Sequence, residues 1–355
     1  MSSKQALDQK AIFYMCLLAL QFGMQPTLTR KYTADGICRS TVILMQELLK
    51  FFFAFFMLNV SGGLKSAVAG KHIVKFEVCF LYCEFSLTAE LSSSLDWNIS
   101  TWVTVAFLPA ALYALQNIAA LQAYQNLDAL TFNVLNQTKT LSAALCCYLV
   151  MGRKQSLMQV FSLLLLLLSA LVMEKMVPIY SLFSADVSVQ MPEWGSSHWS
   201  QGVAPIMLAS FISGLSGAIS QKSLQTLGGG GRNPYLFSME LCAASGLILG
   251  GSLLITHDGQ RIAEQGFFDG WTATTWIPIV TNSIGGIIVG LVTKYAGSVR
   301  KGFALIFGIL LSGIVQGITQ PDVGVSKEQF VGGFLAAISL WMHATNPYKP
   351  KEKTE

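Results

Sequence analysis

Residues 157–176 read LMQVFSLLLLLLSALVMEKM, a run with no charged residue between Leu157 and Met173. About 20 residues of this kind are enough to cross the hydrocarbon core of a membrane as a helix. Lipid offers no hydrogen-bond partner to the backbone, so we expect each such stretch to be helical. Ten stretches are predicted to cross, at approximately 11–30, 40–60, 99–122, 129–149, 157–176, 201–225, 234–256, 272–294, 300–319 and 327–345.

The composition indicates the same class of protein. Of the 355 residues, 52% are hydrophobic and 12% are charged, whereas an average soluble domain has about 25% charged residues. The chain lacks the polar groups that would cover a soluble globule, which excludes an ordinary cytosolic enzyme. A net charge of +4 is too small to indicate binding to nucleic acid. The prediction is an all-α polytopic membrane protein that needs no metal and no cofactor.

We expect residues 1–355 to form one transmembrane domain. Ten crossings divide into a first half at 11–176 and a second half at 201–345, followed by a tail at 346–355. Because five crossings are an odd number, the second half enters the membrane from the opposite face. That arrangement is the inverted repeat found in many transporters.

The distribution of basic residues predicts the orientation. If the N-terminus is cytosolic, 15 of the 23 Lys and Arg residues lie on the cytosolic side and six on the other. Lys50 and Lys139 are the two that lie within crossings. An excess of basic residues marks the cytosolic face of membrane proteins, so both termini are predicted to be cytosolic.

Ionisable residues inside a crossing are costly and usually mark a pathway. In the second crossing, Glu47 and Lys50 are three residues apart, on one face of the expected helix. They can neutralise each other as an intrahelical ion pair. The alternative is that both side chains line a substrate cavity.

The fourth crossing contains an unusually polar run, TFNVLNQTKT at 131–140. In one continuous helix, Phe132 and Lys139 lie close to one face, and Asn133, Gln137 and Thr140 lie on the adjacent face. Lys139 is too deep to reach the interface easily, so it needs an anionic partner. A bound anion is one candidate, and an ion pair with Glu240 of the seventh crossing is the structural alternative.

The ninth crossing opens with Arg300, Lys301, Gly302 and Phe303. These basic residues are explained either by anchoring at the cytosolic face or by a substrate site. The fourth and ninth crossings are equivalent in a five-plus-five repeat, so two lysines on them suit a substrate with two phosphates. Further candidate substrate-binding residues are Asn117, Ser213, Ser238 and Glu240.

The tail ends in Lys351-Glu-Lys353-Thr-Glu355. Lysines at the third and fifth positions from the end form, on a cytosolic tail, the dilysine signal that coat proteins read. The sequence therefore predicts retrieval to the endoplasmic reticulum, with the Golgi as the second choice of membrane.

At these residues the chain resembles the nucleotide-sugar transporters of the drug/metabolite transporter superfamily, in the branch of CMP-sialic acid, UDP-galactose and UDP-N-acetylglucosamine carriers. It is most similar to plant endoplasmic-reticulum carriers of UDP-N-acetylhexosamines. The resemblance spans most of the chain. The stretches that carry it are Glu47 to Lys50, Ala114 to Asn117, Asn126 to Asp128, Gln137 to Lys139, and Lys294 to Phe303.

The resemblance implies an antiporter that exchanges a cytosolic nucleotide sugar for luminal nucleoside monophosphate. It implies that Lys139 and Lys301 contact phosphate and that Asn117 lies in the cavity. Phe132 and Glu240 stand where sialic-acid carriers have tyrosines. These departures disfavour CMP-sialic acid and favour UDP-GlcNAc or UDP-GalNAc exchanged for UMP.

Two other classes remain open at this level. A proton-driven exporter of small metabolites would use Glu47 or Glu240 as its proton carrier and would not need Lys139. A non-transporting membrane scaffold is suggested by residues 77–96, which match no pattern of the family and contain Glu77, Glu84, Glu90 and Asp96. A membrane enzyme is disfavoured, because the loops of the far side lack clustered His or paired Asp. The sugar, the base, the coupling ratio and the presence of a homo-oligomer are undetermined by the sequence.

Overall fold

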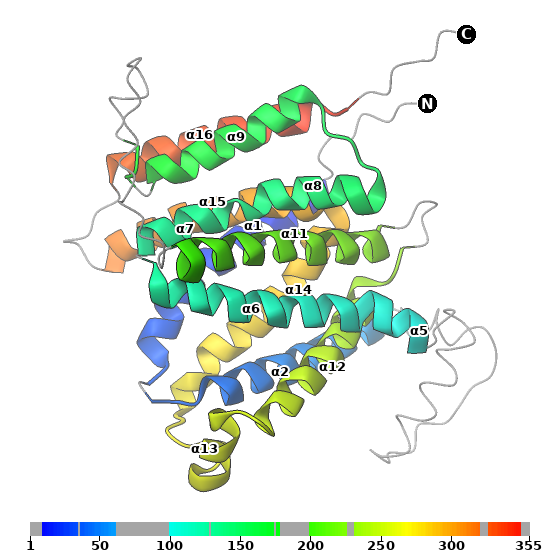
Figure 1. The fold of residues 1–355 in the computed structure, drawn as a ribbon, viewed down its shortest axis with the longest axis vertical. Helices are drawn as coiled ribbons and strands as arrows, with labels where there is room; N and C mark the ends of the chain where they lie inside the picture. The colour runs from blue at the N-terminus through cyan, green and yellow to red at the C-terminus, as the bar shows by residue number, and fades with distance from the viewer. Residues whose placement is uncertain are drawn as a thin grey trace.

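The computed structural model describes residues 9–34, 36–61, 99–127, 129–173, 175–177, 199–225, 231–319 and 326–348. Regular structure within these residues is entirely helical, and the helices lie side by side in one bundle (Figure 1). The segment 77–96 and the tail lysines Lys351 and Lys353 lie outside the described residues. The helices are α1 (Gln9–Tyr32), α2 (Arg39–Val60), α5 (Ile99–Trp102), η1 (Val103–Phe107), α6 (Leu108–Asn126), α7 (Ala129–Gln137), α8 (Lys139–Met151), α9 (Leu157–Met173), η3 (Trp199–Val203), α11 (Ala204–Leu224), α12 (Pro234–Leu253), α13 (His257–Gln265), η4 (Ala273–Thr275), α14 (Trp276–Tyr295), α15 (Ser298–Thr319) and α16 (Lys327–Thr345).

Seven helical spans in the described part are long and apolar enough to cross a membrane. They correspond to the predicted crossings one to three and six to nine, and make the chain a multi-pass membrane protein. Helices also occupy the other three predicted ranges, but they do not meet the same measure. The fourth is divided into α7 and α8, α9 has only 17 residues, and α16 carries Lys327, Glu328 and His343. The number of ten crossings therefore remains a prediction.

The division of the fourth crossing corrects the prediction of one continuous helix there. Helix α7 ends at Gln137 and α8 begins at Lys139. Between them, the N–H of Thr138 donates to the Leu135 carbonyl at 3.1 Å, and the Thr138 hydroxyl donates to the same carbonyl at 2.6 Å. This tight turn interrupts the regular helical hydrogen bonding, so the faces assigned across 132–140 for one continuous helix are not exact.

Contacts between the two halves follow a reciprocal pattern. The predicted first half begins with α1 and the predicted second half with α11. In chain order, the equivalent helices of the two halves are α1 and α11, α2 and α12, α6 and α14, α8 and α15, and α9 and α16. The contact of α1 with α14 has its counterpart in α6 with α11, and that of α1 with α15 in α8 with α11. The contact of α2 with α14 likewise matches α6 with α12. The pairs α2 with α12, α8 with α15, and α9 with α16 each join equivalent helices. Exchanging the halves thus reproduces the principal contacts between them.

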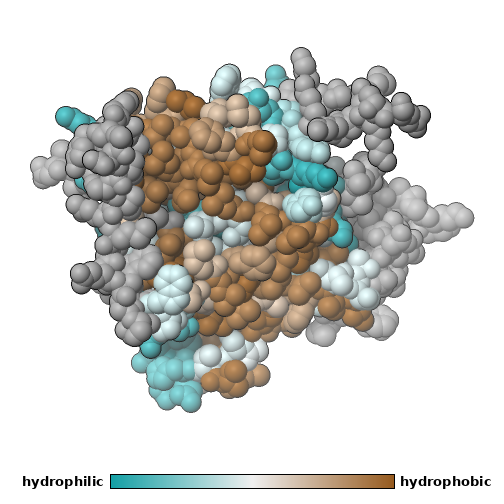
Figure 2. All heavy atoms as spheres, turned by 45° about the horizontal axis from the view of Figure 1, so that its top comes forward, coloured by the Kyte–Doolittle hydropathy of each residue, from teal (hydrophilic) through white to brown (hydrophobic). Residues whose placement is uncertain are grey.

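The outer surface of the bundle is apolar. Figure 2 shows hydrophobic residues spread over most of the described face, with hydrophilic residues gathered towards its margins. Large apolar side chains that are at least half exposed include Leu157, Phe161, Leu164, Leu247 and Phe334. Exposure of such an apolar surface to water would be unfavourable. A bilayer matches it, so these residues face lipid in the membrane.

Glycines set the distance between some helices but not others. A Cβ on Gly214 of α11 would lie 2.6 Å from the backbone nitrogen of Ala143 in α8. Only a residue without a side chain fits there. Gly246 and Gly250 in α12 have the same small-residue spacing, which favours close packing, yet a Cβ on either would meet nothing within 4 Å. The spacing alone therefore does not produce close packing, since these two glycines face open space.

We expect Gly214→Ala to destabilise the bundle, because the new methyl group collides with backbone that cannot move aside. Overpacking of this kind costs about 1–3 kcal/mol, which should lower the thermal unfolding midpoint of the detergent-solubilised protein. Gly246→Ala is the matched control and should leave the midpoint unchanged or raise it slightly. Equal midpoints for the two variants would show that α8 and α11 are not in close contact.

Candidate functional site

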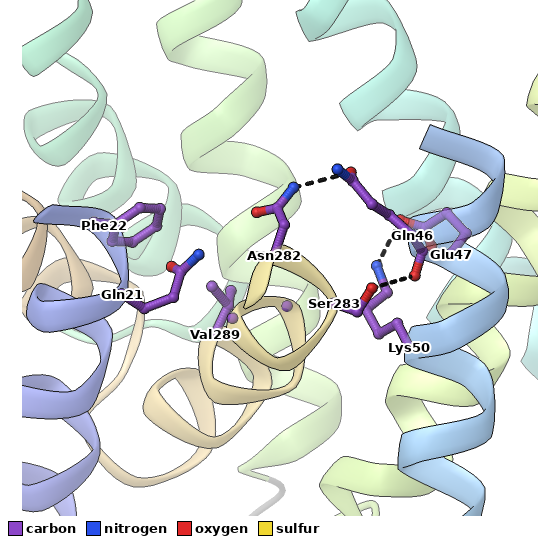
Figure 3. Close-up of a pocket in the computed structure, with 10 residues that line it drawn as sticks. Gln21, Phe22, Gln46, Glu47, Lys50, Asn282, Ser283 and Val289 are labelled. Atoms are coloured by element: carbon purple, nitrogen blue, oxygen red, sulfur yellow. Dashed lines mark hydrogen bonds and ion pairs between the residues drawn. The ribbon is translucent and has the colours of Figure 1, made fainter. Parts of the chain in front are cut away.

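A polar cavity of about 190 Å³ lies between α1, α2 and α14. We call it the ion-pair cavity. Figure 3 shows that α14 lies between the other two helices, with Asn282 and Ser283 facing Gln46 of α2. The Asn282 amide donates to Gln46 Oε1 at 2.9 Å, and the Ser283 hydroxyl donates to the Gln46 carbonyl at 3.0 Å. The residues that line the ion-pair cavity are Gln21, Phe22, Gln46, Glu47, Lys50, Asn282, Ser283, Gly285, Gly286 and Val289.

Glu47 and Lys50 form the predicted intrahelical ion pair, with Lys50 Nζ 2.6 Å from Glu47 Oε1. Both side chains also line the cavity, so the two alternatives drawn from the sequence hold together. Gly286 makes this possible, because a Cβ there would lie 2.5 Å from Lys50 Cδ. The pair thus neutralises itself within the membrane and leaves no net charge on this cavity.

A second cavity, of about 280 Å³, contains Lys139 and Lys301. We call it the lysine cavity. Its walls come from both halves of the chain, and Phe22 and Val289 line both cavities, which makes the two neighbours. The lining residues are Phe22, Tyr113, Lys139, Thr140, Ala143, Ser213, Gly217, Val289, Ser298, Lys301, Gly302 and Leu305. Together the two cavities fall within the roughly 300–1,000 Å³ of small-molecule sites.

The lysine cavity is positively charged. Ion pairs in the described part of the chain join Lys50 to Glu47, Arg232 to Glu240, and Arg261 to Asp269. Neither Lys139 nor Lys301 has a carboxylate partner among those residues, and their two charges repel each other. Two ammonium groups in a membrane interior need an anion. A ligand with about two negative charges would neutralise them.

The structural alternative for Lys139, an ion pair with Glu240, is wrong. The two carboxylate oxygens of Glu240 instead accept from the guanidinium of Arg232, one of them from Arg232 Nε at 2.7 Å. Glu240 is only 7% exposed. Its partner lies eight residues earlier, in the connection that leads into α12, and the pair is bidentate. Glu240 lines neither cavity.

The other predicted residues are spread over the bundle. Ser213 lies in the lysine cavity. Asn117 is exposed on α6, and Ser238 is buried with its hydroxyl donating to the Pro234 carbonyl at 2.8 Å. Phe132 packs edge-on against Tyr124. Asn133 belongs to α7 but its side chain is outside the described set, and Gln137 has a buried Oε1 with no recorded partner.

Several cavity residues escaped the sequence analysis. Gln21 and Asn282 are amides inside apolar crossings and could have been found by the criterion that singled out Asn117. Tyr113 and Ser298 carried no signal, since single Tyr and Ser residues are common in membrane helices. Thr140 belonged to the polar run but was not selected as a site residue.

Comparison with known proteins agrees with this architecture. The family model described as "Nucleotide-sugar transporter" matches residues 7–344. The chain belongs to the nucleotide-sugar transporter family. This assignment agrees with the resemblance found in the sequence, and the homologues are transporters rather than enzymes.

Three relatives illustrate the range of similarity. The chain is 31% identical to the UDP-N-acetylglucosamine transporter ROCK1 of Arabidopsis thaliana, over 99% of this chain and 97% of the relative. It is 29% identical to a UDP-N-acetylglucosamine transporter of Rattus norvegicus, over 68% and 70% of the two chains. Identity to the UDP-N-acetylglucosamine/UDP-N-acetylgalactosamine transporter nstp-4 of Caenorhabditis elegans is 25%, over 98% and 95%.

A solved crystal structure also shares the fold. It superposes with a TM-score of 0.59 over 94% of this chain and 96% of the other, at 10% sequence identity. At that identity the likeness concerns the path of the backbone alone.

The buried Arg232–Glu240 pair predicts an asymmetric response to mutation. Glu240→Gln leaves the Arg232 charge without its partner, which should cost about 3–5 kcal/mol of stability. Replacing both residues, as in Arg232→Met with Glu240→Leu, removes both charges and should restore most of the loss. Thermal unfolding of the purified variants measures this. A double variant as unstable as Glu240→Gln would contradict the pairing.

Proposed function

We propose that this chain exchanges a cytosolic UDP-N-acetylhexosamine, UDP-GlcNAc or UDP-GalNAc, for luminal UMP. The observation that carries the proposal is the lysine cavity, where Lys139 and Lys301 meet with no carboxylate partner in the described part. The relatives named as UDP-N-acetylglucosamine transporters support the choice of substrate. The Caenorhabditis elegans relative, which is named as a transporter of both UDP-N-acetylglucosamine and UDP-N-acetylgalactosamine, supports UDP-GalNAc as a second substrate.

Charge supports an exchange rather than one-way transport. A UDP-sugar carries about one negative charge on each of its two phosphates, and a phosphate monoester such as UMP carries about 1.5–2 at pH 7. Either ligand can therefore neutralise both ammonium groups. When the empty carrier reorients, the charges of Lys139 and Lys301 would be enclosed without an anion, which is costly in a membrane.

The reciprocal contacts between the halves support an inverted repeat of five plus five crossings. In carriers built this way, one repeat rocks against the other around a central site. Lys139 comes from the first half and Lys301 from the second, and they meet where such motion would alternate access. The basic residues support an orientation with both termini cytosolic.

The proton-driven exporter is less favoured. Its proton carrier would be Glu47 or Glu240, and each of these carboxylates is held by a cation, Lys50 or Arg232. A proton carrier has to be released from such partners in every cycle. The exporter also leaves Lys139 and Lys301 without a role.

We propose the endoplasmic reticulum as the membrane of residence, on the spacing of Lys351 and Lys353. Coat proteins that read this signal would be the partners. Replacing both lysines with Ser in a chain tagged at its N-terminus should shift the protein towards the Golgi. An unchanged distribution would mean that the tail is merely basic.

Proteoliposomes test the exchange directly. Uptake of labelled UDP-GlcNAc should rise several-fold when the vesicles are preloaded with UMP. Bound UMP neutralises the two lysines while the carrier reorients to face the outside again. Empty vesicles with an imposed pH gradient are the control and should show little uptake. Uptake that follows the pH gradient and ignores internal UMP would favour the exporter.

Removing one lysine should impair the exchange. Lys139→Gln or Lys301→Gln deletes a buried charged contact to phosphate, a loss of about 2 kcal/mol or more, which is at least about 30-fold in affinity. Lys154→Gln is the matched control, since Lys154 is exposed between α8 and α9. Near-normal exchange by the Lys139→Gln protein would remove this residue from the phosphate site.

A further inference from the structure

The break between α7 and α8 is marked by the hydrogen bonds of the Leu135 carbonyl. In a continuous helix, the N–H of Lys139 would donate to the carbonyl of Leu135, four residues earlier. That carbonyl instead accepts from the N–H and the hydroxyl of Thr138, and the Ser210 hydroxyl of α11 approaches it at 3.4 Å. The first bond of the new helix runs from Ser142 N–H to the Thr138 carbonyl at 3.0 Å.

The break gives α8 an N-terminus of its own in the middle of the predicted crossing. The first N–H groups of a helix have no carbonyl partner within that helix. The aligned peptide dipoles add about half a positive charge at this end. Lys139, Thr140 and Ala143 of α8 line the lysine cavity, so the N-terminal turn of this 13-residue helix opens onto it.

Thr140 is a second and independent feature of this wall. Its side chain is only 5% exposed, yet no hydrogen bond of its hydroxyl is recorded with any described residue. Gly302, next to Lys301, leaves room for it, because a Cβ on Gly302 would lie 2.4 Å from Thr140 Oγ1. Because Thr140 lines the lysine cavity, its hydroxyl is available to a ligand there. A ligand in the cavity would supply the missing acceptor.

We propose that the Thr140 hydroxyl and the N-terminal turn of α8 form a third part of the anion site, binding a phosphate oxygen of the nucleotide between Lys139 and Lys301. This inference rests on the proposed function, which places the phosphates in the lysine cavity. The lysines supply charge, but each is a point charge on a flexible side chain and does not fix the position or orientation of the anion. Thr140 and the N–H groups, fixed to the helix, determine where the phosphate sits.

The test is binding of UMP to the full-length protein in detergent. Thr140→Val keeps the shape and removes the hydroxyl, whereas Thr140→Ser keeps the hydroxyl. A hydrogen bond to a charged group is worth enough that Val should weaken UMP binding about tenfold to a hundredfold. Ser should bind UMP within about threefold of the parent. Binding of uridine, which has no phosphate, should be equal for all three proteins.

Gly302→Ala provides a second route to the same result. It retains the Thr140 hydroxyl but places a methyl group against it, and should weaken UMP binding with no effect on uridine. Lys139→Gln distinguishes a failure of the Thr140 inference from a failure of the proposed phosphate site. If Thr140→Val binds UMP like the parent while Lys139→Gln does not, the inference about Thr140 is overturned and the phosphate site stands. If Lys139→Gln also binds UMP normally, the proposed function itself fails.

Discussion

Two ammonium groups that share one cavity within the membrane are the constraint on which the rest of this structure depends. Two further pairs of partly buried charges neutralise each other, Glu47 with Lys50 and Arg232 with Glu240. Lys139 and Lys301 lack carboxylate partners among the described residues and face the same space. An arrangement that is costly when empty and relieved by a dianion is a property of a carrier that moves loaded. This arrangement supports the proposed function, in which the carrier moves with an anion bound.

The two neighbouring cavities differ in charge, and this difference matches the substrate of the proposed function. The ion-pair cavity is polar and neutral, since Glu47 and Lys50 compensate each other at 2.6 Å. Beyond Phe22 and Val289, the lysine cavity is cationic. A nucleotide sugar has the same division, with uncharged groups on either side of a charged diphosphate. Gly286 and Gly302 keep each cavity open, because a Cβ at either position would collide with Lys50 or Thr140.

The sequence predicted much of this fold because the membrane permits few solutions. An apolar run such as 157–173 has to be helical, and helices lie in all ten predicted ranges. Lys139 was selected as a charged residue in an apolar crossing, and Lys301 for its place on the equivalent crossing and for the resemblance to the family. Both lie in one cavity with the candidate Ser213. The break at Thr138 was missed because the sequence does not show that the Thr138 hydroxyl bonds back to the Leu135 carbonyl, which Ser210 of α11 also approaches. The partner of Glu240 was missed for a related reason, since the fold of a connection places Arg232 beside it.

The central claim is that the phosphate of the nucleotide, held by Lys139 and Lys301, dominates binding. The most direct measurement compares the affinities of UMP and uridine for the purified protein and for the variant with both lysines replaced by Gln. Two charged hydrogen-bonded contacts should make UMP bind at least about 100-fold more tightly than uridine in the parent protein. That preference should nearly vanish in the double variant. Equal affinities of UMP and uridine for the parent protein would contradict the account.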